Sequence, residues 1–191
     1  MADCNELFSD EDFVVEHLFA SPENARLIQD FSVGNDAMGL EMFLKEVSEQ
    51  EEKEKQTRTY LIKDRYTGEL VCYFSIRTGL ITLQVEGDSF DSLSALELSN
   101  FAMNQKYKEK HPNARRLGFY FFKRFILPLA NFVSEYVGVS TLYIYALPDD
   151  RLIEHYKKMG FSRLPEDQEK FVQSHVKPKY DEGCIFMYQI L

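Results

Sequence analysis

Four segments between residues 95 and 161 decide the fold: ALELSNFAM (95–103), RRLGFY (115–120), TLYIYA (141–146) and IEHYKKMGF (153–161). The first and third are predicted strands, although Ala, Leu and Glu in the first also favour a helix. The second opens a predicted amphipathic helix that extends to Tyr136. A helix N-terminus carries N–H groups without helical partners and a partial positive charge, and a glycine lets the backbone approach a ligand closely. The pattern therefore predicts a pyrophosphate cradle at Gly118, with Arg115 and Arg116 beside it.

Outside this region the sequence alternates between helix and strand signals. Capping residues and apolar spacing predict helices over residues 9–18, 21–31, 40–47 and 149–160. Aromatic and β-branched runs predict strands over residues 57–64, 70–78, 80–85 and 184–191. Polar composition predicts irregular segments over residues 87–94, 104–113 and 162–183. Pro128 is expected to kink the helix that follows Gly118.

This order of elements indicates one fold class. A hairpin followed by strand–helix–strand units implies an α/β, three-layer α-β-α arrangement with a mixed, mostly antiparallel sheet. The chain has 191 residues and no inter-domain linker is evident, so we expect a single domain covering residues 1–191.

Composition narrows the classes of function. The formal net charge is -9 and the pI about 5.0, which argues against nucleic acid as the main partner because phosphate binding needs a basic surface. The three cysteines are widely spaced without a CxxC pair, so neither a disulfide framework nor a zinc site is expected. No apolar run reaches the length of a signal peptide or a membrane span, which predicts a cytoplasmic protein with no membrane partner.

The quoted segments together resemble the signature of the GNAT (GCN5-related) N-acetyltransferases. In that family Gln or Arg, two residues, Gly, one residue and then Gly or Ala bind the pyrophosphate of acetyl-CoA; here Arg115 and Gly118 match, and Tyr120 replaces the small residue. Segments 95–103 and 141–146 resemble the family's fourth and fifth strands, which run parallel and splay apart around the cofactor. Segment 153–161 resembles its later helix, which ends in Gly-Phe.

The resemblance also implies roles for individual residues. Glu97 would take a proton from the acceptor amine, and Tyr156 would give a proton to the leaving thiolate. A backbone N–H near Met103 would stabilise the oxyanion. The implied acetyl-CoA contacts are Phe101, Ala102, Met103, Arg115, Arg116, Leu117, Gly118, Phe119 and Tyr120. No metal is expected.

Several functions stay open from the sequence. We expect an acetyl-CoA-dependent N-acetyltransferase acting on an amine of a small molecule or peptide, and the sequence leaves open whether the chain forms a homodimer. An alternative is a non-catalytic acyl-CoA-binding regulatory module with the same fold, which the Tyr120 departure leaves open. A toxin that acts on charged tRNA also belongs to such families, but the net charge of -9 weighs against it.

Overall fold

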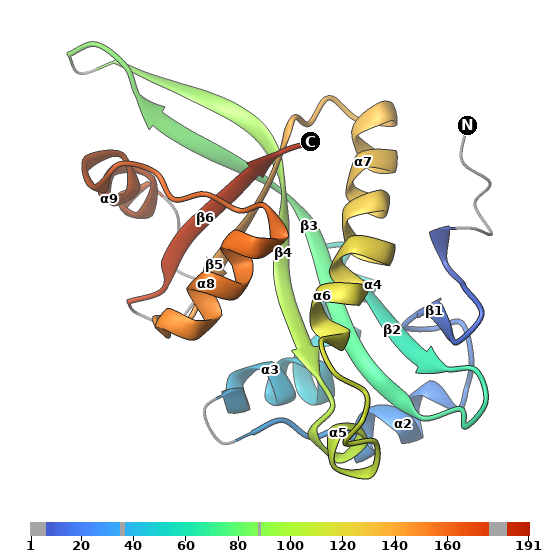
Figure 1. Cartoon of the computed structure of the whole chain (residues 1–191). Helices are drawn as coiled ribbons and strands as arrows, with labels where there is room; N and C mark the ends of the chain where they lie inside the picture. The colour runs from blue at the N-terminus through green and yellow to red at the C-terminus, as the bar shows by residue number, and fades with distance from the viewer. Residues whose placement is uncertain (1–6, 35–36, 88, 176–182) are drawn as a thin grey trace. The chain divides into compact units, whose positions relative to one another are not determined.

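The computed structural model describes residues 7–34, 37–87, 89–175 and 183–191, and Figure 1 labels its elements. The strands are β1 Phe13–His17, β2 Arg58–Asp64, β3 Leu70–Gln84, β4 Phe90–Met103, β5 Thr141–Ala146 and β6 Ile185–Ile190. The helices are α2 Asn24–Asp30, α3 Met38–Met42, η2 Phe43–Val47, α4 Ser48–Lys53, α5 Gln105–Lys110, α6 Leu117–Phe121, η3 Phe122–Ile126, α7 Leu127–Tyr136, α8 Asp150–Met159 and α9 Glu166–Ser174; η2 and η3 are π-helical.

The strands form one mixed sheet in the order β1-β2-β3-β4-β5-β6. The pairs β1–β2, β2–β3 and β5–β6 are antiparallel, whereas β4 and β5 are parallel. Parallel pairing covers only Ala95–Glu97 of β4, although β4 runs on to Met103, and no residue pair past Glu97 joins it to β5 in the described chain. The predicted three-layer α/β fold with a splayed parallel pair is confirmed.

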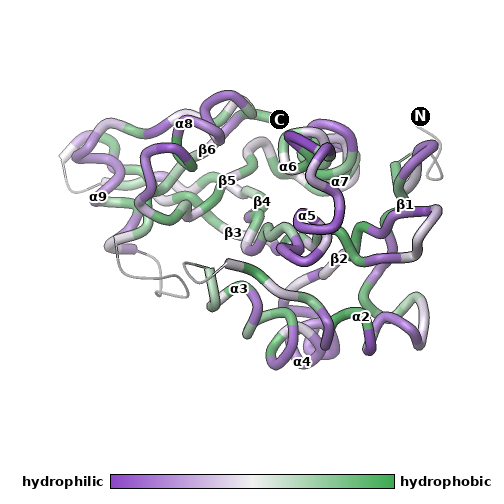
Figure 2. Tube along the Cα trace, turned by 60° about the horizontal axis from the view of Figure 1, so that its bottom comes forward, coloured by the Kyte–Doolittle hydropathy of each residue, from purple (hydrophilic) through white to green (hydrophobic). Residues whose placement is uncertain are grey.

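The chain divides into two compact units. Unit 1 comprises residues 1–77 and 99–128, and its core joins buried residues of the helices, such as Ile28 and Leu44, to the strand residues Leu61 and Tyr73. The buried Tyr73 hydroxyl donates to the carbonyl of Leu40 at 2.6 Å, which satisfies its hydrogen bond inside an apolar core. Within this unit the strands lie between α6 on one side and α2, α3 and α4 on the other (Figure 2).

Unit 2 comprises residues 78–98 and 129–191. Ile81, Ala95, Tyr143, Val172 and Phe186 form its buried cluster, so α9 covers one face of these strands. Successive side chains of a strand point to opposite faces, so Leu142, Ile144 and Ala146 of β5, all buried, belong to the other face. The unit therefore has apolar residues on both sides of its strands, as a buried parallel segment requires.

Four local predictions are corrected by the structure. Residues 13–17 form β1 and not a helix, because their alternating burial fits antiparallel pairing with β2. The two strands expected around Gly79 are one strand, β3. The polar segments 104–113 and 162–183 contain the short helices α5 and α9. Strand β4 begins at Phe90, inside the segment expected to be a loop.

The α8 boundaries follow the sequence closely. The Asp149 carboxylate accepts a hydrogen bond from the N–H of Leu152 at 3.0 Å, which caps the helix start. Gly160 ends the helix with φ of 109°, a left-handed conformation that glycine adopts without strain. The predicted helix is confirmed. It could be predicted because both signals act within a few residues along the chain.

Candidate functional site

The helical run that begins at Leu117 starts at the surface. Arg115 and Arg116 are exposed, and Leu117, Gly118 and Phe119 are half-buried. Its first backbone bond joins the N–H of Tyr120 to the carbonyl of Arg116 at 3.1 Å. The N–H groups of Leu117 and Gly118 have no hydrogen-bond partner in the part of the chain that the structure describes. The predicted cradle is therefore accessible to an anion, and the helix run continues behind it as α6, η3 and α7.

Arg116 turns the chain into this helix through a strained conformation. Its φ is 60° and ψ is 23°, in the left-handed region that a non-glycine residue enters at a cost of about 1–2 kcal/mol. No side chain caps the helix start. Strain of this kind persists where the surrounding structure enforces it, and it clusters at binding sites.

Tyr120 does not fill the cradle. Its hydroxyl donates to the carboxylate of Asp10 at 2.6 Å, and its ring lies 6.1 Å from the ring of Phe13. Partial desolvation and this hydrogen bond raise the pKa of Tyr120 to about 12. The side chain is thus held against the segment around β1, by Asp10 and by contact with Phe13.

The end of β4 lies in the same unit as this helix start. Ala102 is buried in the unit 1 core, while Phe101 and Met103 are half-buried and alternate with it. Asn104, the next residue, caps α5 by accepting from the N–H of Lys106. The structure thus brings the β4 and α6 residues predicted to contact the cofactor into unit 1.

Glu97 lies in unit 2 and is buried, with 6% of its surface exposed. The hydroxyl of Tyr143 on β5 donates to Glu97 Oε2 at 2.8 Å. Tyr143 itself is buried in the unit 2 cluster, and its ring lies against the backbone of Gly79 on β3. The sequence did not indicate Tyr143, because its contact with Glu97 joins positions 46 residues apart.

Tyr156 is the other predicted catalytic residue. It lies on α8 in unit 2, is 9% exposed, and its ring packs edge-on against Phe161 at 5.7 Å. Its backbone carbonyl accepts hydrogen bonds from the N–H groups of Gly160 and Phe161. The helix end and the Gly-Phe pair therefore hold this tyrosine in place.

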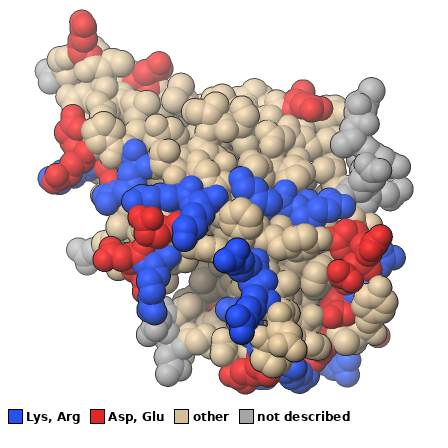
Figure 3. Space-filling view, viewed as in Figure 1, with Lys and Arg blue, Asp and Glu red and all other residues tan. Residues whose placement is uncertain are grey.

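Positive charge gathers in one stretch of unit 1. Residues 105–124 contain seven Lys and Arg and one Glu, so seven minus one gives +6, against -9 for the whole chain. On the face drawn in Figure 3, Lys and Arg side chains lie over α6 and the loop before it. Lys106, Lys108, Arg115 and Arg116 form no ion pair with any described residue. These cations are available to a polyanion.

Solved structures with this fold include bacterial toxins. A Tyr-to-Phe mutant of KacT is 15% identical with a TM-score of 0.66, covering 94% of this chain and 95% of that one. AtaTR bound with acetyl-CoA is 16% identical with a TM-score of 0.60, covering 95% and 94%. AtaT complexed with acetyl-methionyl-tRNAfMet is 15% identical with a TM-score of 0.61, covering 94% and 95%. The chain has the GNAT acetyltransferase fold. Neither a protein-family model nor a curated protein matches the sequence.

The GNAT comparison overturns one prediction. The exclusion of nucleic acid, and with it the small-molecule or peptide acceptor, is wrong, because a protein of this fold is seen with an acetylated aminoacyl-tRNA and another in a KacTA–DNA complex. Net charge averages over the whole surface, whereas a polyanion meets a local patch such as residues 105–124.

Within the described ranges, no group of three or more His, Cys, Asp or Glu side chains is placed to hold a metal ion. No helix there is long and apolar enough to cross a membrane.

Proposed function

We propose that this GNAT-fold chain transfers an acetyl group from acetyl-CoA to the amino group of an aminoacyl-tRNA. One observation carries the cofactor assignment: the helix start at Leu117 and Gly118 is half-buried, and the N–H groups of these two residues lack partners among the described residues, beside two exposed arginines. The KacT and AtaT folds support it, since AtaTR is known bound with acetyl-CoA.

The acceptor class rests on two observations. AtaT, which has the same fold, forms a complex with acetyl-methionyl-tRNAfMet. In this chain the stretch with a formal charge of +6 includes Lys106, Lys108, Arg115 and Arg116, which form no ion pair with any described residue. Phosphate contacts dominate the affinity of proteins for nucleic acid. An aminoacyl-tRNA supplies both the phosphates and the free α-amino group that acetylation needs.

In the reaction, the amine nitrogen attacks the thioester carbonyl carbon, the C–S bond breaks, and an amide forms. We assign Glu97 the proton that the amine loses, directly or through water, and Tyr156 the proton that the coenzyme A thiolate gains. A backbone N–H near Met103 stabilises the oxyanion of the tetrahedral intermediate.

The test measures coenzyme A release from acetyl-CoA with aminoacylated tRNA, deacylated tRNA and free amino acids as acceptors. We expect release only with aminoacylated tRNA. Tyr156→Phe and Glu97→Gln should lower kcat at least tenfold with coenzyme A affinity unchanged, because general acid–base groups contribute about 10²–10⁴-fold. Tyr136→Phe is the matched control, since Tyr136 is 63% exposed.

The alternative is a non-catalytic acyl-CoA-binding module. It would be favoured if coenzyme A binds and no acceptor in the panel, tRNA or amine, is acetylated. Loss of coenzyme A binding altogether would remove both proposals, because each depends on the helix start at Gly118.

A further inference from the structure

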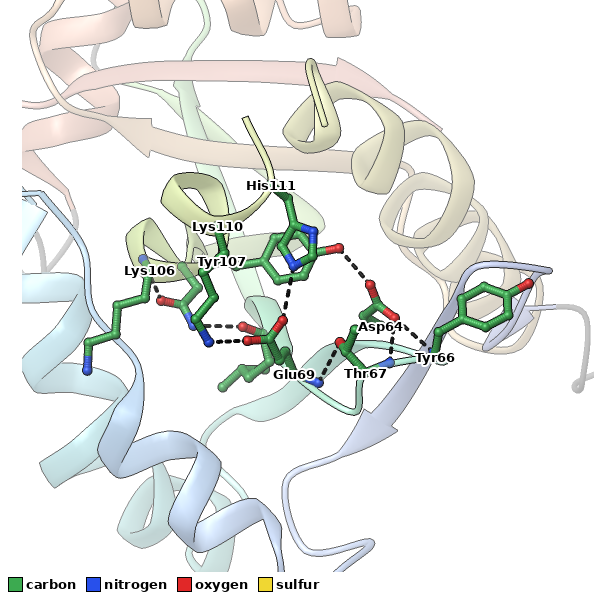
Figure 4. Close-up of polar contacts among 10 residues, drawn as sticks. Asp64, Tyr66, Thr67, Glu69, Lys106, Tyr107, Lys110 and His111 are labelled. Carbon is green, nitrogen blue, oxygen red and sulfur yellow. Dashed lines mark hydrogen bonds and ion pairs between the residues drawn. The ribbon is translucent and has the colours of Figure 1, made fainter. Parts of the chain in front are cut away.

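The turn between β2 and β3 holds two carboxylates that face α5 (Figure 4). Asp64 ends β2, and its Oδ1 accepts hydrogen bonds from the N–H groups of Tyr66 at 2.8 Å and Thr67 at 2.9 Å. This Asx arrangement fixes the turn and leaves Oδ2 directed at α5. Glu69 follows at the other end of the same turn.

Three side chains of α5 and its C-cap, those of Tyr107, Lys110 and His111, meet those carboxylates. The hydroxyl of Tyr107 donates to Asp64 Oδ2 at 2.7 Å. His111 Nε2 lies 3.0 Å from Glu69 Oε2, and Lys110 forms an ion pair with Glu69. The His111 ring stacks on the Tyr107 ring with centroids 4.2 Å apart, so the two contacts support each other.

Burial of Tyr107 and ionisation of Asp64 strengthen the hydrogen bond between these two side chains. Tyr107 is 4% exposed, and desolvation together with the bond to Asp64 raises its pKa above the usual range of tyrosine. Desolvation acts to raise the pKa of Asp64, but hydrogen bonds from Thr67 and Tyr107 outweigh it and lower the pKa. The carboxylate is therefore ionised at neutral pH, and a hydrogen bond to a charged group contributes about twice as much as a neutral one.

The cluster ends where the cradle loop begins. His111 is the C-cap of α5, and residues 111–116 connect it to the start of α6. Within this loop the N–H of Ala114 bonds to the carbonyl of His111 at 3.0 Å. The far end of the loop is the left-handed Arg116. The position of the helix start thus depends on how firmly the α5 end of the loop is held.

We propose that Tyr107 and His111 are positioning residues for the pyrophosphate cradle, acting through Asp64 and Glu69 of the β2–β3 turn. The inference rests on the proposed function, because it assumes that the helix start binds coenzyme A. We call the contacts of Tyr107 with Asp64 and of His111 with Glu69 the clamp. When the clamp is intact, the loop is held in its binding arrangement before the ligand arrives. When it is broken, only a fraction of molecules is competent, and the apparent Kd rises as the inverse of that fraction.

The experiment measures coenzyme A binding by calorimetry for the full chain and for Tyr107→Phe, which removes only the hydroxyl. Tyr66→Phe is the matched control, because Tyr66 lies in the same turn and is 79% exposed. We expect Tyr107→Phe to raise the Kd of coenzyme A about three- to tenfold, and Tyr66→Phe to leave it unchanged. His111→Ala should also raise the Kd of coenzyme A. The double variant should have a Kd close to that of either single variant, because both substitutions break the same clamp.

A second readout separates positioning from general stability. With a saturating acceptor, Tyr107→Phe should raise KM for acetyl-CoA and leave kcat at saturation unchanged, since the variant removes neither of the proposed reacting groups, Glu97 and Tyr156. Equal Kd values for Tyr107→Phe and the wild type, with both folded, would overturn the inference while leaving the proposed function standing. Failure of the wild type to bind coenzyme A would overturn the proposed function itself.

Discussion

Gly79 is a position where a single added methyl group should be strongly destabilising. A Cβ built on Gly79 would lie 2.0 Å from Tyr143 Oη, 2.8 Å from Cζ and 2.9 Å from Cε1. Contacts under 3.0 Å force one partner to move, and Tyr143 has little room because it is 3% exposed within the unit 2 cluster. Gly79→Ala must therefore displace a buried tyrosine.

The magnitude follows from two contributions. Overpacking a filled core costs about 1–3 kcal/mol. Displacing Tyr143 also breaks its 2.8 Å hydrogen bond to Glu97, and a buried acceptor that loses its donor costs about 1–3 kcal/mol. We expect Gly79→Ala to lower the free energy of unfolding by about 3 kcal/mol, or Tm by about 6–12 °C for a chain of this size.

The assay is urea unfolding followed by circular dichroism, with Gly39→Ala as the matched control. A Cβ at Gly39 meets no heavy atom within 4 Å, and Gly39 lies inside α3, where alanine is favoured by up to about 1 kcal/mol. The control should therefore be stabilised. In a Tyr143→Phe background the penalty should shrink, because the shortest contact involves the hydroxyl, but persist because ring carbons still clash.

A loss below about 1 kcal/mol for Gly79→Ala would refute this reasoning, since Tyr143 would then move without cost. The same variant bears on catalysis, because Tyr143 holds one oxygen of Glu97. If acetyl transfer survives in folded Gly79→Ala protein at the wild-type rate, the position of the Glu97 carboxylate does not limit the reaction.

Three further outcomes are expected. Arg116→Gly should raise the free energy of unfolding in denaturant titrations by up to about 1 kcal/mol, because glycine adopts the left-handed φ without strain. The same variant should weaken coenzyme A binding, because it removes a positive charge. An unchanged affinity for coenzyme A would exclude Arg116 from the cradle. Tyr120→Phe should cost about 1 kcal/mol through its lost bond to Asp10, and weakened coenzyme A binding in calorimetry would contradict our placement of its side chain. Hydrogen bonds from Lys110 and His111 lower the pKa of Glu69, so ionised Glu69 stabilises the folded chain relative to Glu69→Gln. The difference in free energy of unfolding between the wild type and Glu69→Gln should be largest above pH 4.5 and should vanish as the pH falls through the lowered pKa of Glu69. A difference that does not change with pH in urea titrations would be evidence against this role of Glu69.

The sequence predicted the elements whose signals are local. The Asp149 side chain and the left-handed backbone of Gly160 mark the two ends of α8, and the short apolar run 141–146 forms a strand that is buried at five of its six positions. Residues 13–17 were misread because Ser9 and Asp12 mimic a helix cap, while pairing with β2 decides the conformation. Gly79 suggests a break between two strands, yet β3 passes through it. The glycine is explained by packing, because Tyr143 occupies the space that a side chain at this position would take.

The candidate site likewise contains residues with local sequence signals and residues positioned by contacts between distant segments. The proposed cradle at Gly118 was visible in the sequence because a glycine, two arginines and a helix start are consecutive in the chain. The partners Tyr143, Asp64 and Glu69 were not, since each reaches its contact across 42 to 46 residues. Hydrogen bonds between distant segments leave no periodic trace, so they appear only once the strands are paired.

The net charge of the whole chain is a poor guide to whether the protein binds a polyanion. Removing the stretch with +6 from a chain of -9 leaves -15 on the other residues, so the two parts carry opposite charge. Screening confines each charge to about 8–10 Å at physiological salt. A phosphate near Arg115 and Arg116 therefore interacts mainly with that stretch and only weakly with acidic residues beyond this distance. A local excess of cations can bind a polyanion on an acidic protein, and the sign of the total charge does not decide the partner.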